Sequence, residues 1–202
     1  IFILLNKKDF HLLESAYLLS LSYAIENDNN EFLNNIFKSF IIWLSNFISH
    51  EGGLATDPEY DIIELLMKAE KKELLMDLFK FCFDNNYNWY FMESFDFMLG
   101  KNNSFTISFV NEFIEKYPNY VPPYTIQFLT NVFKDQTNEA KAIISQMNNE
   151  KKINEFLSLI VENFIIDNDS FSEKTKILNA FKGFDNLSNR IKNKIEVYTF
   201  PI

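Results

Sequence analysis

Glycine and proline are scarce in this sequence, with 4 and 5 copies among 202 residues. β-Sandwiches and β-barrels need many tight turns, so this scarcity argues against both classes. Apolar residues make up 47% of the chain, which is enough to fill a core and excludes a disordered polar chain. Phenylalanine is the dominant aromatic residue, with 23 copies. Each buried Phe contributes roughly 1.5–3 kcal/mol of transfer free energy, so we expect a wide aromatic core.

Cysteine and arginine each occur once, as Cys82 and Arg190. A single cysteine cannot form an intrachain disulfide, and we therefore expect a reducing, cytoplasmic compartment. The apolar neighbours of Cys82 predict that its thiol is buried. Arginine is the preferred side chain for bidentate contacts with phosphates and bases. With one arginine and a net charge of −9, the chain is not expected to bind nucleic acid.

The sequence has no apolar run of the length that spans a bilayer, which is about 20 residues. We therefore predict no membrane span. The apolar residues 1–5 have no basic region before them, so a signal peptide is not supported. The chain begins without Met and ends in the apolar segment 199–202. Both ends look cut or trimmed, and we treat the sequence as a candidate fragment of a longer protein.

Apolar residues recur at steps of three and four along nearly the whole chain, which is the spacing of one helix face. The clearest case predicts a helix over about 31–49, with Asp28 as the residue that caps its start. Further helix starts are predicted at Asp57-Pro58, Ser104, Pro122-Pro123, Thr137, about 150 and Ser170. The pattern gives ten or eleven helices, joined by short linkers.

Helix–loop–helix units are predicted at 57–86, 104–134 and 137–166, a spacing typical of tandem helical repeats. The turn at 116–123 is similar to the inter-repeat turn of tetratricopeptide proteins, although Phe and Ile stand where that family has small residues. A looser HEAT-like or irregular solenoid is equally compatible. We therefore predict an all-α fold in which residues 1–202 form a single helical-repeat domain. It would be a right-handed stack of antiparallel helix pairs, that is, an irregular α-solenoid.

Catalytic and metal-binding motifs are missing from the sequence. It contains no Gly-rich phosphate loop, no Gly-x-Ser-x-Gly motif and no paired-cysteine metal site. The two histidines, His11 and His50, lack the further nearby ligands that zinc needs. The acidic segment 167–169 lacks the Gly and the Glu of a calcium loop. We therefore expect a protein that is not an enzyme and has no cofactor and no metal site.

Aromatic residues are densest at residues 87–97. This segment supplies three candidate binding residues, Tyr87, Trp89 and Tyr90. Tryptophan and tyrosine are common anchors of protein interfaces, and neighbouring residues cannot all lie on one buried helix face. Core packing is the competing interpretation of the cluster. A weaker aromatic candidate surrounds the prolines and consists of Tyr117, Tyr120 and Tyr124.

Charge is distributed unevenly along the chain. Residues 1–100 carry 16 acids and 7 lysines, a net of −9, whereas residues 101–202 carry 12 acids and 12 bases. This asymmetry suits electrostatic steering of a basic partner, for which Glu59, Asp61 and Glu64 are the acidic candidates. The alternative is that the acids simply keep a Phe-rich protein soluble.

Two functions are consistent with these observations. The first is a non-catalytic protein–protein interaction or scaffolding module whose concave face binds a protein or peptide. The alternative is an acidic inhibitor or immunity-type protein that neutralises a basic enzyme, with an association rate that falls steeply as salt rises. The sequence sets neither the identity of the partner nor the oligomeric state.

Overall fold

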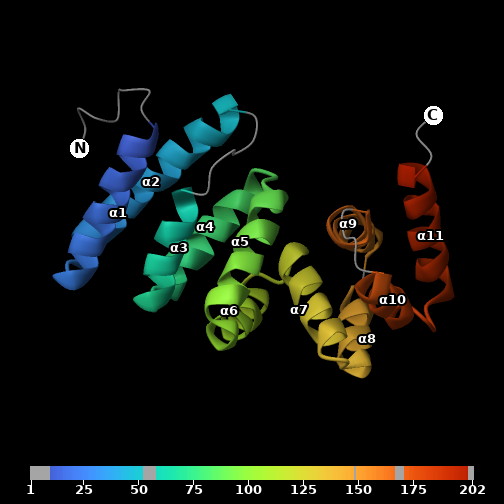
Figure 1. Cartoon of the computed structure of the whole chain (residues 1–202). Helices are drawn as coiled ribbons and strands as arrows, with labels where there is room; N and C mark the ends of the chain where they lie inside the picture. Colours follow the sequence, from blue (N-terminus) through green and yellow to red (C-terminus); the bar gives the residue numbers. More distant parts are fainter. Residues whose placement is uncertain (1–9, 52–57, 148, 167–170, 200–202) are drawn as a thin grey trace. The chain divides into compact units, whose positions relative to one another are not determined.

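The computed structural model describes residues 10–51, 58–147, 149–166 and 171–199 (Figure 1). Over these residues the chain forms eleven α-helices and one short π-helix, and it contains no strand. The prediction of an all-α fold with ten or eleven helices is therefore confirmed. None of the helices in these ranges is both long and apolar enough to cross a membrane.

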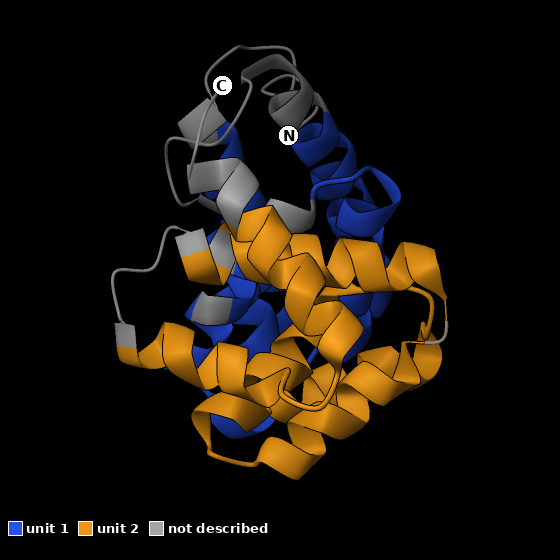
Figure 2. Ribbon diagram, turned by 90° about the vertical axis from the view of Figure 1, so that its right-hand side faces the viewer, with its two compact units in different colours: residues 1–106 blue, residues 107–202 orange. Residues whose placement is uncertain are grey.

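The chain divides into two compact units, residues 1–106 and residues 107–202 (Figure 2). Each unit has its own buried apolar residues, so each is described by itself. The single helical-repeat domain over residues 1–202 stays a prediction.

Unit 1 contains five helices in contact with one another. They are α1 (Phe10–Glu26), α2 (Asn30–Glu51), α3 (Pro58–Lys68), α4 (Lys72–Asp84) and α5 (Asn88–Lys101). Helix α1 packs along α2 and against α3, while α5 contacts both α3 and α4. The first two helices are antiparallel, since Tyr17 contacts Phe40 and Tyr23 contacts Phe32. Tyr17, Phe40 and Trp43 form an aromatic cluster between them, with ring centroids 5.7 Å apart in each pair.

Unit 2 is built around a trio of phenylalanines. Its elements are α6 (Asn103–Lys116), which begins in unit 1, α7 (Pro122–Phe133), α8 (Thr137–Gln146), α9 (Glu150–Ile160), the π-helix η1 (Val161–Ile166), α10 (Phe171–Ala180) and α11 (Asp185–Thr199). Phe128 on α7, Phe156 on α9 and Phe181 after α10 are buried, with ring centroids 5.3–6.2 Å apart. The aromatic core predicted from the phenylalanine content is confirmed here.

Four of the helix connections share one backbone structure. Each has a single residue with positive φ after the helix: Asp28, Glu70, Asn86 and Asp135. In every case the N–H of that residue bonds to the carbonyl three positions earlier, and the next N–H bonds to the carbonyl five positions earlier. This is the Schellman ending, which satisfies carbonyls at the end of a helix. The four turns connect α1 to α2, α3 to α4, α4 to α5 and α7 to α8, and the two helices of each pair are in contact.

Two predicted helix caps are wrong. Asp28 occupies the left-handed turn position, and Asn29 caps α2 by accepting a 3.0 Å hydrogen bond from the backbone N–H three residues later. Ser104 lies inside α6, whose cap is Asn102, with the corresponding hydrogen bond at 3.1 Å. In both cases an asparagine near the predicted residue supplies the cap, because its amide oxygen reaches the free N–H groups of the first turn.

The predicted helix–loop–helix units each coincide with consecutive helices, but in the second half the helices that pack together are not those of one predicted unit. The unit at 57–86 coincides with α3 and α4. The boundary between 104–134 and 137–166, however, falls inside the tight turn at Asp135 that joins α7 to α8, which pack against each other. This turn contains neither Gly nor Pro, so composition gave no sign that it joins two helices that pack against each other.

Candidate functional site

Helix α1 is apolar on two opposite faces. Its buried face consists of Leu13, Tyr17, Leu21 and Ala24. Leu19 and Tyr23 lie one turn apart on the other side, and their side chains are 70% and 60% exposed. Among the residues whose side chains the structure describes, the other exposed large apolar residues are Ile42 on α2, Phe133 on α7 and Leu178 on α10. Apolar surface in water is unfavourable, and a contiguous apolar patch marks a site of contact with another molecule.

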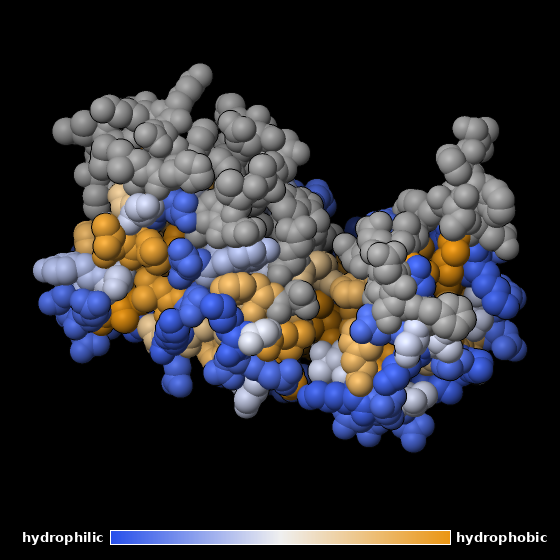
Figure 3. Space-filling model, viewed as in Figure 1, coloured by the Kyte–Doolittle hydropathy of each residue, from blue (hydrophilic) through white to orange (hydrophobic). Residues whose placement is uncertain are grey.

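We call Ser15, Leu19, Tyr23 and Glu26 the α1 stripe, because all four are exposed and follow one another at steps of three and four along the helix. Hydrophobic residues reach the surface over α1 and α2 in the space-filling view (Figure 3). Ser22 donates a 3.1 Å hydrogen bond to the carboxylate of Glu26 and so orients it at the end of the stripe. The stripe therefore combines two apolar side chains with a fixed carboxylate.

The stripe ends at an acidic turn. Glu26, Asp28 and Glu31 are all exposed there. The rings of Tyr23 and Phe32 form a T-shaped pair with centroids 6.4 Å apart, so the apolar part of the stripe lies next to the start of α2. Lys38 is the only lysine or arginine between residues 10 and 51. The turn next to Tyr23 therefore carries three exposed carboxylates, and α1 and α2 supply one basic side chain, Lys38, over their described residues.

All three predicted acidic candidates lie on α3, and Glu64 is neutralised by two lysines. Its carboxylate oxygens are 2.7 Å from the Nζ of Lys101 and 2.7 Å from the Nζ of Lys68. Hydrogen bonds from Lys101 and then from Lys68 lower the pKa of Glu64 to about 2. Its charge is thus compensated within unit 1. Asp61 is exposed, whereas the side chain of Glu59 lies outside the described part of the structure.

Aromatic stacking continues the Glu64 network between α3 and α5. The Nζ of Lys101 lies 5.2 Å from the centre of the Phe97 ring, which stacks on Tyr60 at 4.6 Å and 11°. Tyr60 and Glu64 are one turn apart on α3, as Phe97 and Lys101 are on α5. Intramolecular packing of these two helices therefore accounts for the position of Glu64.

The predicted aromatic candidates lie at the start of α5. Tyr87 precedes the helix, and its half-buried ring contacts Phe81 with centroids 6.2 Å apart. Its backbone N–H donates a 2.8 Å hydrogen bond to the carbonyl of Cys82, so Tyr87 is part of the turn between α4 and α5. The side chains of Trp89 and Tyr90 lie outside the described part of the structure, and their role in binding stays a prediction.

The second tyrosine group stabilises the connection between α6 and α7. Tyr117 and Tyr120 contact each other edge to face, with centroids 6.2 Å apart. The carbonyl of Pro118 accepts hydrogen bonds from the hydroxyl of Tyr124 at 3.3 Å and from the Nζ of Lys152 at 2.8 Å. These tyrosines therefore have a structural role within unit 2.

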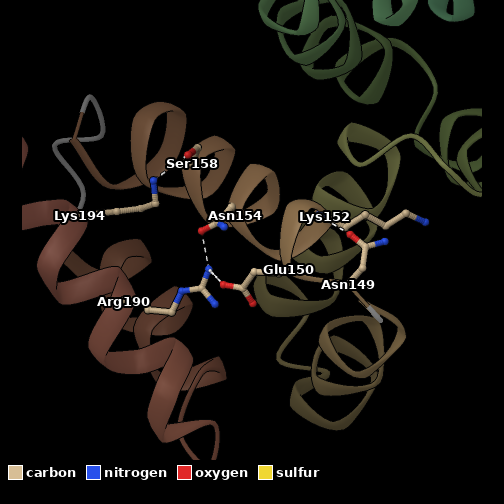
Figure 4. Close-up of polar contacts among 7 residues, drawn as sticks. All are labelled: Asn149, Glu150, Lys152, Asn154, Ser158, Arg190 and Lys194. Atoms are coloured by element: carbon tan, nitrogen blue, oxygen red, sulfur yellow. Dashed lines mark hydrogen bonds and ion pairs between the residues drawn. The ribbon is translucent and has the colours of Figure 1, made fainter.

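Two basic residues of α11 form hydrogen bonds and an ion pair with residues of α9 (Figure 4). Arg190 donates a hydrogen bond to Asn154 and lies 2.9 Å from the carboxylate of Glu150. Lys194 donates a 2.8 Å hydrogen bond to the hydroxyl of Ser158. The three α9 residues lie on successive turns and face the two α11 residues. This ladder of polar contacts holds α11 against α9.

Reactive and metal-ligating side chains do not gather in the described part of the chain. Cys82 is completely buried in α4, as predicted. The side chains of His11 and His50 lie outside the described residues. Among the residues that are described, no group of three or more His, Cys, Asp or Glu side chains is placed to hold a metal ion.

Comparison of the chain with models of known protein families, with curated protein sequences and with solved structures gave no match in any of the three. Among the described residues, the α1 stripe places two of the exposed large apolar side chains, Leu19 and Tyr23, one turn apart on one helix face.

Proposed function

We propose that this chain is a non-catalytic protein-interaction module that binds a partner protein through the α1 stripe. The observation that carries the proposal is the exposure of Leu19 and Tyr23, 70% and 60%, on the side of α1 opposite its buried face. A partner that covered them would remove apolar area from water at roughly 25 cal/mol per Å². Aromatic side chains such as Tyr23 are also enriched among the residues that contribute most to binding.

The repeated helix hairpins support a scaffolding role. Four pairs of neighbouring helices are joined by the same Schellman turn, which is how a chain of stacked hairpins is connected. We propose that these hairpins belong to an irregular right-handed α-solenoid over residues 1–202. Solenoids commonly bind proteins or peptides through extended surfaces without catalytic residues.

The charge of unit 1 favours the second candidate function, an acidic inhibitor of a basic enzyme. Residues 1–106 carry 16 acids and 8 bases, whereas residues 107–202 carry 12 acids and 11 bases. A net charge of −8 on one unit would attract a basic protein and speed its association at low salt. In this alternative, charge would make a larger contribution than the apolar side chains of the stripe.

Affinity capture with the full chain as bait tests the proposal. The bait is compared with the double variant Leu19→Ser/Tyr23→Ser, and captured proteins from the source cells are quantified by mass spectrometry during a salt gradient. The matched control is Phe133→Ser/Leu178→Ser, which also removes two exposed apolar side chains, 39% and 38% exposed, but in unit 2. Circular dichroism checks that both variants fold.

We expect a near-stoichiometric partner that the control retains and that the stripe variant loses. A partner that both variants retain, and that is released early in the salt gradient, would support the inhibitor alternative instead. The absence of any protein that distinguishes the stripe variant from the control would contradict the proposed role of the stripe.

A further inference from the structure

We infer that the partner segment recognised by the α1 stripe is a basic amphipathic helix; this inference rests on the proposed function and names the class of its partner. Leu19, Tyr23 and Glu26 follow one another on one face of α1, and Tyr23 contacts Phe32 at the start of α2, where the exposed Glu31 also lies. A basic amphipathic helix carries the complementary features, namely apolar side chains at steps of three and four and Lys or Arg beside them.

The geometry of α1 favours a helical partner segment over an extended one. Leu19 and Tyr23 stand one turn apart, so they form part of an i, i+4 ridge, and ridges of this kind pack into the grooves of another helix. The backbone groups of α1 are already used within the helix, so an extended strand would find no backbone partners there. The opposite side of α1 is already covered by helices, since α2 and α3 pack against it.

The carboxylates near the stripe require that the partner helix be positively charged. Glu26 lies seven residues beyond Leu19, which is about 10 Å along the axis at 1.5 Å per residue. The exposed Asp28 and Glu31 follow in the turn and in the first turn of α2. The C-terminal end of α1 adds partial negative charge, and its last turn contains no basic residue. A partner helix with two apolar residues one turn apart therefore needs a Lys or Arg about two turns further along.

A second copy of this chain fits the surface less well. Unit 1 carries a net charge of −8, so two stripes would bring two acidic turns into the same interface. Like charges in an interface are unfavourable by several kcal/mol when they are desolvated. The same charges would repel an anionic membrane surface.

Two designed peptides test the inference on the full chain. The first is an amphipathic Leu/Lys helix of about 14 residues, long enough to form three to four turns, and the second has every Lys replaced by Glu. Binding of the fluorescein-labelled peptides is followed by fluorescence anisotropy at low salt and at physiological salt. The stripe variant is again Leu19→Ser/Tyr23→Ser, whose changes leave the charge of the protein unaltered.

Charge reversal supplies the second arm of the test. Glu26→Lys/Glu31→Lys reverses one carboxylate of the stripe and one in the acidic turn beside it. Asp61→Lys/Asp77→Lys is the matched control, because both residues are exposed acids of unit 1 on α3 and α4, outside the stripe and its acidic turn, and the change in net charge is identical. We expect the Lys peptide to bind at least about tenfold more tightly than the Glu peptide. Both stripe variants should weaken that binding about tenfold or more, and the control should change it by less than about threefold.

Four results would overturn the inference. Equal losses in Glu26→Lys/Glu31→Lys and Asp61→Lys/Asp77→Lys would show diffuse attraction to an acidic protein. Unchanged binding in Leu19→Ser/Tyr23→Ser would show that the apolar side chains are not used. Self-association of the chain that the stripe variant abolishes, measured by sedimentation, would assign the stripe to a second copy. A captured partner that lacks a basic helix would also overturn the inference, while the proposed function would stand.

Discussion

The hydroxyl of Tyr17 on α1 donates a 3.0 Å hydrogen bond to the backbone carbonyl of Ser39 on α2. This bond crosses the interface of the first hairpin beside the aromatic cluster with Phe40 and Trp43. Burial raises the pKa of Tyr17 from 10.0 to about 12. Because the folded-state pKa is the higher one, the stability linked to the neutral phenol is complete below about pH 10 and is lost as the pH rises through about 12.

Replacing Tyr17 by Phe removes both the hydrogen bond and the titrating group. We expect Tyr17→Phe to lower the unfolding free energy by about 1 kcal/mol at neutral pH, since the carbonyl of Ser39 loses its partner on α1. The decline of stability between about pH 10 and pH 12 should become shallower. Denaturant unfolding followed by circular dichroism at several pH values measures both effects. Tyr23→Phe, at an exposed position, is the control, and an equally steep alkaline decline in Tyr17→Phe would refute the linkage.

The lowered pKa of Glu64 predicts that the stability of the fold depends on pH in the acidic range. Lys101 and Lys68 hold the pKa of its carboxyl at about 2, below the ordinary 4.5. As the pH falls, the unfolded chain therefore takes up the proton first, so the contribution of Glu64 is present above about pH 4.5 and disappears toward about pH 2. We expect Glu64→Gln to be less stable than the native chain at neutral pH, with the difference shrinking over this interval. Thermal unfolding between these pH values checks it, with the exposed Asp61→Asn as control.

The turn at Glu70 predicts a stabilising substitution. Glu70 has φ +53°, a conformation that costs a residue with a side chain more than it costs glycine. We expect Glu70→Gly to raise the unfolding free energy by about 0.5–1 kcal/mol, net of the greater freedom of glycine in the unfolded chain. The neighbouring Lys71 has φ −81°, so Lys71→Gly should be destabilising. Chemical denaturation of both variants makes the comparison, and a destabilised Glu70→Gly would argue against the left-handed turn.

Local sequence patterns predicted individual helices well. The starts at Pro58, Pro122 and Thr137 agree with the structure, since proline and small polar residues act on the first turn of the helix that they begin. The burial of Cys82 followed from its apolar neighbours in the same way. Such signals depend on residues within one or two turns, which a sequence displays directly.

The sequence alone does not determine which helices pair or which residue caps each helix. Left-handed turns usually contain Gly or Asn, but Glu70 and Asp135 adopt this conformation here because helix packing on both sides of the turn fixes it. Asp28 and Asn29 are both good capping residues, and only the backbone decides which of them becomes the cap. Which neighbouring helices pack together as a hairpin could therefore not be predicted from the sequence.

The candidate site was the least predictable part of the chain. Glu64 reads as an exposed acid in the sequence, but Lys101, 37 residues away, neutralises it through the packing of α5 on α3. Leu19 and Tyr23 are exposed, although apolar residues at helical spacing predict a buried helix face. A sequence signal did exist: α1 contains apolar residues on two opposite faces, more than one buried face requires.

The ladder between α9 and α11 predicts the local stability of the last helix. Arg190 contacts Glu150 and Asn154, and its side chain is only 20% exposed. Arg190→Met keeps much of the apolar stem but removes these contacts, which should cost up to about 1 kcal/mol. We expect amide hydrogens of α11 to exchange up to about fivefold faster in this variant. The exposed Lys192 on the same helix gives the matched control, Lys192→Met.

Salt provides an independent check on the same ladder. Ion pairs near the surface are screened as ionic strength rises, so the native chain should lose part of the α11 protection in high salt while Arg190→Met should lose less. Hydrogen exchange read by mass spectrometry resolves this helix from the rest of unit 2. Equal exchange in Arg190→Met, Lys192→Met and the native chain at low salt would mean that the Arg190 contacts do not stabilise α11, which is then held by the Lys194 hydrogen bond and the apolar contacts of Leu187 and Ile191.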